Sequence, residues 1–220
     1  MRLLLLRHGQ TPSNVSGLLD TAAPGPGLTE LGTRQAAAVP GALDGVPIDA
    51  IVVSSLTRTT LTAAPLAHQR ALPAMRIDGL REIEAGRLEL AADSDAHRTY
   101  LGTAFGWARG DLDRRIPGGP DGHQFLRRFD AALATVAAQG WHTVVAVSHG
   151  AAIRAWASAR VAGVDLDEVA STPLANTGLF EIDGDQTRGW QLVRWNPDPI
   201  GGQELAAADA GDPTGEPAGH

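Results

Sequence analysis

The chain has 220 residues, an apolar share of 43% and a formal net charge of −7 at pH 7. This size and composition predict a single soluble globular domain. The mild negative charge provides no global attraction to nucleic acid or to an anionic membrane, and no stretch approaches the roughly 20 consecutive apolar residues of a membrane span. The absence of cysteine excludes thiolate nucleophiles, disulfide frameworks and cysteine-based zinc sites. We therefore expect a cytoplasmic protein without nucleic-acid or membrane partners.

Lysine is absent as well, so every basic side chain apart from histidine is an arginine. This excludes Schiff-base chemistry and the phosphate-loop lysine. An arginine guanidinium is planar and can bind two oxygens of one phosphate group. Any anion site in this chain must therefore be local and built from arginine and histidine.

Three short apolar runs have the pattern of buried parallel strands that open into functional loops. They span residues 2–6, 51–53 and 144–147. Ser54-Ser55 is expected to cap a helix after the second run, and Pro65 is expected to end or kink that helix. After the third run, an alanine-rich helix is expected over residues 151–161.

Two more helices and one hairpin complete the predicted elements. Residues 29–43 predict a helix interrupted near Pro40, and residues 124–138 predict an amphipathic helix. Residues 179–182 and 190–195 are typical of a hairpin along one edge of a sheet. Because strands alternate with helices, the chain is predicted to fold as an α/β protein with a mostly parallel, doubly wound sheet.

A single domain is predicted over residues 1–196. Within it, residues 91–119 are mixed in character and contain four arginines, so we interpret them as an excursion over the active site that selects the substrate. Residues 197–220 are rich in glycine, proline, alanine and acidic residues. This composition buries too little apolar surface to fold, so the segment is predicted to be a flexible tail.

Polar side chains follow each of the three predicted strands. Arg7 and His8 follow the first, Arg58 lies shortly after the second, and His149 follows the third. In open parallel sheets, ligands bind beyond the carboxyl ends of the strands. Two imidazoles and two guanidiniums are therefore expected to meet at one anion site.

The chemistry that fits this group is phosphoryl transfer. Its transition state spreads negative charge over three oxygens, which Arg7, Arg58 and His149 can stabilise as fixed donors. His8 is the candidate nucleophile, provided that one ring nitrogen is unprotonated and the proton on the other is held by a carbonyl or a carboxylate. We expect His8 to be neutral, because neighbouring arginines disfavour its charged form. A protonated His149 is compatible with the same site.

The leaving alkoxide needs a proton from a carboxylic acid on the far side of the phosphorus. Glu82 and Glu84, in a polar turn after a strand-like segment, are the candidates, and Glu82 is the first choice. Burial and a nearby phosphate dianion would raise the pKa of such a carboxyl and keep it protonated. Taken singly, each site residue has a simpler interpretation as a structural histidine or a solvated charge, so the prediction depends on their joint occurrence and order.

Five segments within residues 2 to about 182 carry these residues and follow one another along the chain. They are Arg7-His8-Gly9-Gln10-Thr11 with Asn14, Leu28 to Gly32 with Gln35-Ala36, Ser54 to Arg58 with Thr62-Ala63, Leu80-Arg81-Glu82 with Gly86, and Ser148-His149-Gly150 with Ile153-Arg154. Together they closely resemble the signature blocks of the histidine phosphatase superfamily, also called the phosphoglycerate mutase-like family, in the order in which that family has them.

The resemblance implies a three-layer α/β sandwich with helices on both faces of the sheet and a phosphohistidine intermediate on His8. It also implies catalytic roles for Arg7, Arg58 and His149 at the phosphate, and for Glu82 as general acid and base. No metal and no organic cofactor is implied. The expected substrate-binding residues are Asn14, Gly9, Gln10, Thr11, Gly150, Arg114 and Arg115.

The chain departs from the family pattern at three places, and two of them flank the pocket and leave the substrate open. Ala151 stands where a further glycine is common, Leu88-Glu89-Leu90 where a terminal glycine is usual, and Pro120-Asp121 follows Pro117-Gly118-Gly119 where Glu-Ser is usual. The backbone at residues 88–90 and the loop at 117–121 are therefore expected to differ from the family.

The leading prediction is a phosphatase that hydrolyses a small phosphorylated metabolite. A phosphoglycerate mutase is the alternative, because Arg114 and Arg115 have the charge to bind a second anionic group, although an exposed pair on a loop is more often solvated. A catalytically silent phosphate-binding module is a third hypothesis. A dinucleotide-binding enzyme is disfavoured, because Gly-x-Gly-x-x-Gly is absent after the first strand. The identity of the substrate and the oligomeric state stay open, with a homodimer as one expectation.

Overall fold

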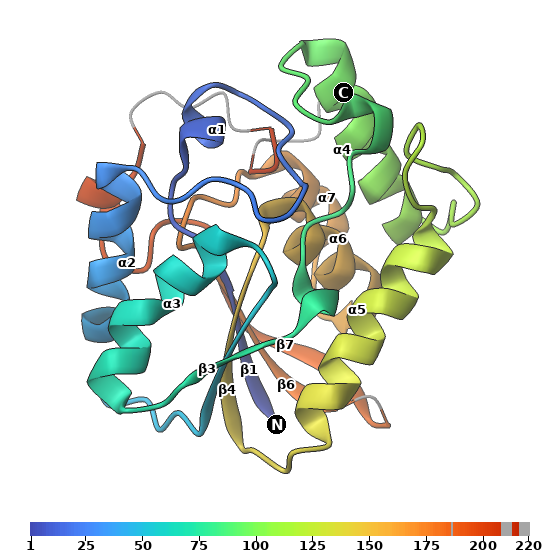
Figure 1. The fold of residues 1–220 in the computed structure, drawn as a ribbon. Coiled ribbons are helices and arrows are strands. Elements are labelled where there is room, and N and C mark those ends of the chain that lie inside the picture. Colours follow the sequence, from blue (N-terminus) through green and yellow to red (C-terminus); the bar gives the residue numbers. More distant parts are fainter. Residues whose placement is uncertain (186, 208–212, 216–220) are drawn as a thin grey trace.

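The computed structural model describes residues 1–185, 187–207 and 213–215, which are built around a seven-stranded sheet (Figure 1). The strands lie in the order β3-β2-β4-β1-β6-β7-β5. Their bounds are β1 (Arg2–Arg7), β2 (Ala50–Val53), β3 (Ala74–Arg76), β4 (Thr143–Ser148), β5 (Val161–Ala162), β6 (Leu179–Asp185) and β7 (Gly189–Asn196).

The sheet is mixed but mostly parallel. β1, β2, β3 and β4 run parallel to one another, whereas β6 is antiparallel to both β1 and β7. This confirms the predicted α/β sheet and the predicted hairpin. The hairpin does not form the edge itself, because the two-residue strand β5 pairs with the outer side of β7.

Helices cover both faces of the sheet, as predicted for a three-layer sandwich. α2 and α3 lie on one face, and α4, α5 and α6 lie on the other (Figure 1). The α-helices are α1 (Pro12–Val15), α2 (Glu30–Ala42), α3 (Thr57–Arg70), α4 (Ser94–Ala108), α5 (Gly122–Ala137), α6 (Gly150–Arg160) and α7 (Leu166–Ser171), and the 3-10 helices are η1 (Asp78–Leu80), η2 (Gly86–Leu88) and η3 (Gln203–Leu205). In the described part of the chain, no helix combines the length and the apolar character that crossing a bilayer requires.

The central strands are buried on both faces, which explains why their sequences are continuous apolar runs. Successive side chains of a strand point to opposite faces. Along β1, Leu3 and Leu5 pack in the core under α4, α5 and α6, whereas Leu4 and Leu6 pack in the core under α2 and α3. All four leucines are fully buried. Two apolar layers therefore hold the strand that leads into the candidate site.

Two prolines lie inside helices that continue past them. Of the two expected effects of Pro65, an end or a kink, the end does not occur, because α3 continues to Arg70; α2 likewise contains Pro40. A proline removes one hydrogen bond from a helix. In α3, Ala63 and Leu66 are buried against the sheet, and this packing outweighs the lost bond.

The predicted excursion over residues 91–119 contains a core helix. Residues 94–108 form α4, whose Tyr100, Leu101 and Phe105 are buried in the core, and α4 packs along α6. Its other side carries exposed residues such as Arg98, which is why the sequence of this segment has a mixed character. The irregular part after α4 is therefore shorter than expected and spans residues 109–119.

The described parts of the predicted tail lie on the domain. Ile200 packs against the core under α2 and α3, and the carbonyl oxygen of Leu205 accepts a hydrogen bond from Gln35 at 2.8 Å. Thr214 is buried in the site described below. Composition alone misses these positions because single contacts with the domain, such as the packing of Ile200 and the hydrogen bond to Leu205, do not depend on the overall apolar content of the segment. Residues 208–212 and 216–220 lie outside the described residues, so for them the flexible tail stays a prediction.

Candidate active site

The sheet brings the ends of three parallel strands to one edge. Arg7 at the end of β1 pairs with Ser148 at the end of β4, and Val53 at the end of β2 pairs with Val147. The antiparallel strand β6 begins beside Leu6 of β1, so the loop before β6 reaches the same edge. Four loops therefore converge where the sequence predicted three.

His8 follows β1 directly and is buried. Its Nδ1 lies 2.8 Å from the carbonyl oxygen of Gly9, and its Nε2 accepts a hydrogen bond from Arg58 Nε at 3.1 Å. Because Nε2 is an acceptor, the proton of the neutral ring lies on Nδ1 and is donated to the Gly9 carbonyl. Burial first, then Arg58 and Arg7, hold the pKa of His8 well below its usual value against the opposing effect of Gly9. His8 is therefore a neutral imidazole with a lone pair on Nε2.

His149 lies beside His8, with 5.1 Å between the ring centroids. Its Nδ1 accepts a hydrogen bond from Arg58 Nε at 3.3 Å, and its Nε2 is 2.8 Å from Ser54 Oγ. Burial and then the Arg58 guanidinium hold the pKa of His149 well below its usual value. A protonated His149 is therefore not supported, because among the described residues no carboxylate takes part in its hydrogen bonds to offset these two effects.

Arg58 lies in the first turn of α3 and links the two histidines. Its Nε contacts both rings, and its Nη2 donates to the carbonyl oxygen of Asp20 at 2.9 Å. Its Nη1 is buried and has no hydrogen-bond partner within the described part of the chain. The guanidinium thus brings a positive charge and a spare donor between two neutral rings, which suits the binding of an anion.

Arg7 lies against a segment of the C-terminal tail. Its Nη1 donates to the carbonyl oxygen of Leu174, and its Nη2 donates to Thr214 Oγ1 at 3.1 Å. The carbonyl oxygen of Thr214 in turn accepts a hydrogen bond from Arg154 Nη2 at 3.0 Å. The sequence predicted Arg7 at the site but not these tail contacts.

Glu82 places its buried carboxylate at the N-terminus of α6. One oxygen accepts hydrogen bonds from the backbone of Ile83 at 2.9 Å and of Ala152 at 2.8 Å, and the other accepts from the backbone of Ala151 at 3.2 Å. Burial raises the pKa of Glu82, although the backbone donors and Arg58 act in the opposite direction. Arg58 is therefore within electrostatic reach of this carboxyl as well as of both histidines.

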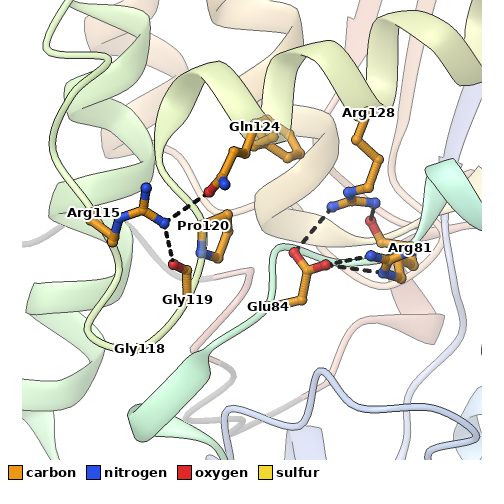
Figure 2. Close-up of a pocket in the computed structure, with 9 residues that line it drawn as sticks. Arg81, Glu84, Arg115, Gly118, Gly119, Pro120, Gln124 and Arg128 are labelled. Carbon is orange, nitrogen blue, oxygen red and sulfur yellow. Dashed lines mark hydrogen bonds and ion pairs between the residues drawn. The ribbon is translucent and has the colours of Figure 1, made fainter.

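Glu84, the other candidate acid, points into a separate cavity of about 460 Å³. Figure 2 shows its carboxylate beside Arg81 and Arg128. One carboxylate oxygen accepts a hydrogen bond from Arg81 Nε at 3.1 Å, and the other lies 3.7 Å from Arg128 Nη2. Burial acts to raise the pKa of Glu84, but these two arginines outweigh it and lower the pKa. No histidine lines this cavity. The geometry therefore favours Glu82 over Glu84 as the proton donor.

Arg114 and Arg115 do not join the histidines. Arg115 lines the cavity of Figure 2, where it donates to the carbonyl oxygen of Gly119 at 2.9 Å and to Gln124 Oε1 at 2.8 Å. It also pairs with Asp121 and is half exposed. Arg114 is exposed after α4. The contacts of Arg115 hold its own loop against the start of α5, and a role of this pair in binding the substrate stays a prediction.

Three of the predicted substrate-binding side chains, those of Gln10, Thr11 and Asn14, have local structural partners. Gln10 Oε1 accepts a hydrogen bond from Thr29 Oγ1 at 2.8 Å. Thr11 is the N-cap of α1 and forms a capping box with Asn14, whose buried side chain lies at the site. The Asn14 side chain also joins the α1 cap to the loop before β6, because its Oδ1 lies 3.4 Å from Asn176 Nδ2. Substrate binding by these three residues stays a prediction.

The two glycines of the predicted pocket permit close approach of other segments. A Cβ on Gly9 would lie 2.7 Å from the carbonyl oxygen of Gly32, and a Cβ on Gly150 would lie 2.5 Å from the carbonyl oxygen of Thr214. Contacts this short do not occur between real side chains and backbone, so any side chain at either position would displace its neighbour. These glycines shape the site by their lack of a side chain.

Asn176, which the sequence reasoning missed, and Thr62 of α3 support the segment that carries His8. Asn176 Nδ2 donates to the carbonyl oxygen of His8 at 3.0 Å and lies 3.4 Å from Asn14 Oδ1. Thr62 Oγ1 accepts a hydrogen bond from the backbone of Gly9 at 2.8 Å. Asn176 precedes β6 in a polar Asn-Thr-Gly loop, and this pattern would have pointed to the site had the direction of β6 been known.

The loop before β6 has a strained residue next to Asn176. Thr177 has a φ of +60°, a conformation that β-branched residues rarely adopt, and its backbone donates a hydrogen bond to the carbonyl oxygen of Arg7 at 3.1 Å. Strain of this kind persists only where the surroundings determine the backbone.

Within the described residues, no cluster of three or more histidine and acidic side chains is arranged to hold a metal ion.

Comparison with known proteins gives a match to a family model. The model is described as "Histidine phosphatase superfamily (branch 1)" and matches residues 3–198. A PE-PGRS family protein of Mycobacterium tuberculosis, PE_PGRS11, is 38% identical over 219 residues, which cover 92% of this chain and 38% of the relative. The chain therefore spans well under half the length of that relative.

Two further matches have names that state an activity. The adenosylcobalamin/alpha-ribazole phosphatase of Escherichia coli is 33% identical over 151 residues, which cover 68% of this chain and 73% of the relative. The solved structure of a mycobacterial glucosyl-3-phosphoglycerate phosphatase in complex with VO3 has a TM-score of 0.73 and 27% identity, and the match covers 89% of this chain and 98% of that chain. The sequence and the fold are thus similar to those of phosphatases.

Proposed function

This chain belongs to the histidine phosphatase superfamily (branch 1), and we propose that it is a phosphatase that hydrolyses a small phosphate monoester through His8. The observation that carries this proposal is the state of His8, which is buried with Nδ1 against the Gly9 carbonyl and Nε2 free of a proton. A histidine nucleophile requires this tautomer. The phosphatase relatives support the same activity.

In the first step, the lone pair of His8 Nε2 attacks the phosphorus, and the bond between phosphorus and the ester oxygen breaks. Arg7, Arg58 and His149 stabilise the charge on the three phosphoryl oxygens. Glu82 donates its proton to the departing oxygen, so that an alcohol leaves. The raised pKa of Glu82 keeps the carboxyl protonated to a higher pH than that of an exposed glutamate.

In the second step, water hydrolyses the phosphohistidine. Glu82 is now a carboxylate and takes a proton from the attacking water, whose oxygen forms a new bond to phosphorus while the bond to His8 Nε2 breaks. Inorganic phosphate leaves, His8 regains its lone pair, and Glu82 is protonated again for the next cycle. The backbone donors at the start of α6 stabilise the carboxylate during this interval.

His8→Ala tests the proposal directly. We expect the variant to lose at least about 10³-fold in kcat on p-nitrophenyl phosphate, because the nucleophile and its phosphoenzyme are both removed. Rapid quenching into alkali, in which phosphohistidine survives, measures the phosphoenzyme. His68→Ala, which removes an exposed histidine from α3, is the matched control and should keep full activity. A phosphoenzyme in His8→Ala, or a tenth of the wild-type rate, would contradict the proposal.

A panel of phosphorylated metabolites, followed by release of inorganic phosphate, identifies the substrate. The panel includes sugar phosphates and phosphoglycerates, because the loops around the active site vary between members of the family and the substrate varies with them. The same panel tests the mutase alternative with 3-phosphoglycerate and a trace of 2,3-bisphosphoglycerate. Formation of 2-phosphoglycerate without free phosphate would replace hydrolysis by phosphoryl transfer as the activity. Binding of vanadate without turnover on any member would favour the silent phosphate-binding module.

A further inference from the structure

The turn that carries Glu82 depends on side chains for its backbone hydrogen bonds. It begins at residue 79 within η1 and ends before η2, so in the described part of the chain no strand ladder or α-helix pairs its carbonyl oxygens. Ser148 Oγ donates to the carbonyl of Leu80 at 2.7 Å, and the Tyr100 hydroxyl donates to the carbonyl of Ile83 at 2.7 Å. Buried carbonyl groups need such partners. The three other carbonyls between residues 79 and 82 share one donor.

That donor is Arg128 of α5. Its Nη1 donates to the carbonyl oxygens of Gly79 at 2.8 Å and Arg81 at 2.9 Å, and its Nη2 donates to the carbonyl oxygen of Glu82 at 2.9 Å. Its guanidinium also lies 5.5 Å from the centroid of the Phe125 ring and is largely buried. One planar fork therefore holds three carbonyl groups in fixed relative positions, which a flexible ammonium cannot do.

Close packing sets the distance between α5 and the turn. A Cβ on Gly79 would lie 2.7 Å from the Cβ of Ala132 and 2.9 Å from the carbonyl oxygen of Arg128. Gly79 therefore allows the turn to approach α5 closely enough for the guanidinium to reach the backbone. Figure 2 shows the Arg128 side chain at the Arg81 backbone and the Glu84 carboxylate, on the side of the turn that faces the cavity.

The Glu82 side chain points from the same turn toward α6, where its carboxylate accepts hydrogen bonds from the backbone N–H groups of Ala151 and Ala152. Arg128 thus contacts the backbone of Glu82 but not its carboxyl in any hydrogen bond within the described residues. A shift of the turn by a fraction of an ångström would move the carboxyl relative to the leaving oxygen, and proton transfer is sensitive to such distances.

We propose that Arg128 is a positioning residue that fixes the turn at residues 79–82 and thereby aims the Glu82 carboxyl at the leaving group. This inference rests on the proposed phosphatase function. The sequence shows only an Arg-Arg pair at 127–128, which is typical of a solvated helix face. The structure separates the two residues, because Arg127 is exposed whereas Arg128 turns inward.

The test compares Arg128→Met, Arg128→Lys and the matched control Arg127→Met, which removes the same charge from the exposed neighbour. Each variant is assayed on p-nitrophenyl phosphate, whose leaving group needs little protonation, and on 2-glycerol phosphate, whose leaving group needs a proton. We expect Arg128→Met to lower kcat on the alkyl ester at least about tenfold more than on the aryl ester. Arg128→Lys should recover part of this loss, and Arg127→Met should keep the wild-type ratio.

A second measurement does not depend on turnover. Labelling glutamate with carbon-13 at the carboxyl position, with assignment by Glu82→Gln, reports the environment of the Glu82 carboxyl by NMR. We expect its resonance to move toward those of exposed glutamates in Arg128→Met and to stay in place in Arg127→Met. If the wild type hydrolyses neither ester, the proposed function fails and this resonance alone decides the role of Arg128.

Two results would overturn the proposal. One is an Arg128→Met protein with the wild-type ratio of the two rates and an unmoved Glu82 resonance. The other is an equal loss on both esters together with a lower melting temperature, because a purely structural role would reduce the folded population without favouring one leaving group. Should Arg128→Met fail to fold, the comparison of Arg128→Lys with the wild type decides by the same ratio and the same resonance.

Discussion

Replacing Glu82 with glutamine keeps the shape of the side chain and removes its transferable proton. We expect kcat on an alkyl phosphate to fall about 10²- to 10⁴-fold, the usual contribution of a general acid. A leaving group of low pKa departs without full protonation, so the loss on p-nitrophenyl phosphate should stay within about tenfold. The prediction is therefore a change in the ratio of two rates, which a general loss of folded protein does not produce.

The structure sets the size of the accompanying loss of stability. The Glu82 carboxylate accepts backbone hydrogen bonds on both oxygens, from Ile83 and Ala152 on one and from Ala151 on the other. The side-chain oxygen of a glutamine can accept the hydrogen bonds from Ile83 and Ala152. Its amide nitrogen then faces the N–H of Ala151, and because both groups are donors, no hydrogen bond forms between them. Leaving that buried donor unpaired costs about 1–3 kcal/mol in the free energy of unfolding. Urea unfolding of the variant measures this cost separately from the rates.

The pH dependence of the wild type provides the same test by another route. Because burial raises the pKa of Glu82, the acid form persists above the usual carboxyl range and is lost as the pH rises through the raised pKa. The rate on the alkyl phosphate should therefore fall along an alkaline limb, and this limb should be absent from Glu82→Gln. The limb should also be weak with p-nitrophenyl phosphate.

Glu84→Gln is the matched control, because it removes an acid from the same turn on the side that faces the cavity. It should leave the ratio of alkyl to aryl rates unchanged. Equal losses on both esters in Glu82→Gln would refute the assignment of Glu82 as the acid. A selective loss on the alkyl ester in Glu84→Gln would transfer the role to Glu84.

Two further predictions concern stability. The pKa values of buried His8 and His149 are both lowered. At a pH below the usual histidine pKa near 6.5, the unfolded chain therefore binds more protons than the folded protein. As the pH drops from 6.5, the free energy of unfolding should fall by up to about 1.4 kcal/mol per pH unit for each histidine. Urea unfolding between pH 7 and 5 should show a smaller slope in His149→Gln, and an unchanged slope would contradict this. Gly9→Ala should destabilise by about 1–3 kcal/mol because its Cβ would meet the Gly32 carbonyl oxygen at 2.7 Å. Gly102→Ala, in α4 with open space around the new Cβ, should stabilise by about 0.5–1 kcal/mol, and equal shifts in melting temperature for the two glycine variants would refute the packing argument.

The central strands were predictable because they are buried on both faces. A continuous apolar run such as residues 2–6 has few alternatives to a strand between two helical layers. The helix after β2 was harder to predict, since Pro65 is a local signal for an end and the packing of Leu66 against the sheet is not local. Tertiary burial outweighed the local preference there.

The candidate site divides in the same way. Arg7, His8, Arg58 and His149 follow strand ends, so the general rule for parallel sheets was enough to bring them together. The sequence ranked Glu82 before Glu84, but it did not show where either carboxyl lies, because both residues belong to one irregular turn with no period to indicate which side faces the strands. The structure separates them, with one carboxyl at the start of α6 and the other in the cavity.

The sequence by itself determined the fold class and the chemical identity of the groups around His8, because both depend on local patterns, namely apolar runs and the polar residues that end them. Only the tertiary structure decided how those groups are supported. Asn176, Arg128 and Thr214 reach the site from loops, a helix and a tail that are distant in the chain. Their partners are mostly backbone carbonyls. Because every residue has a carbonyl group, the side-chain pattern of the sequence does not identify which carbonyl groups these residues contact.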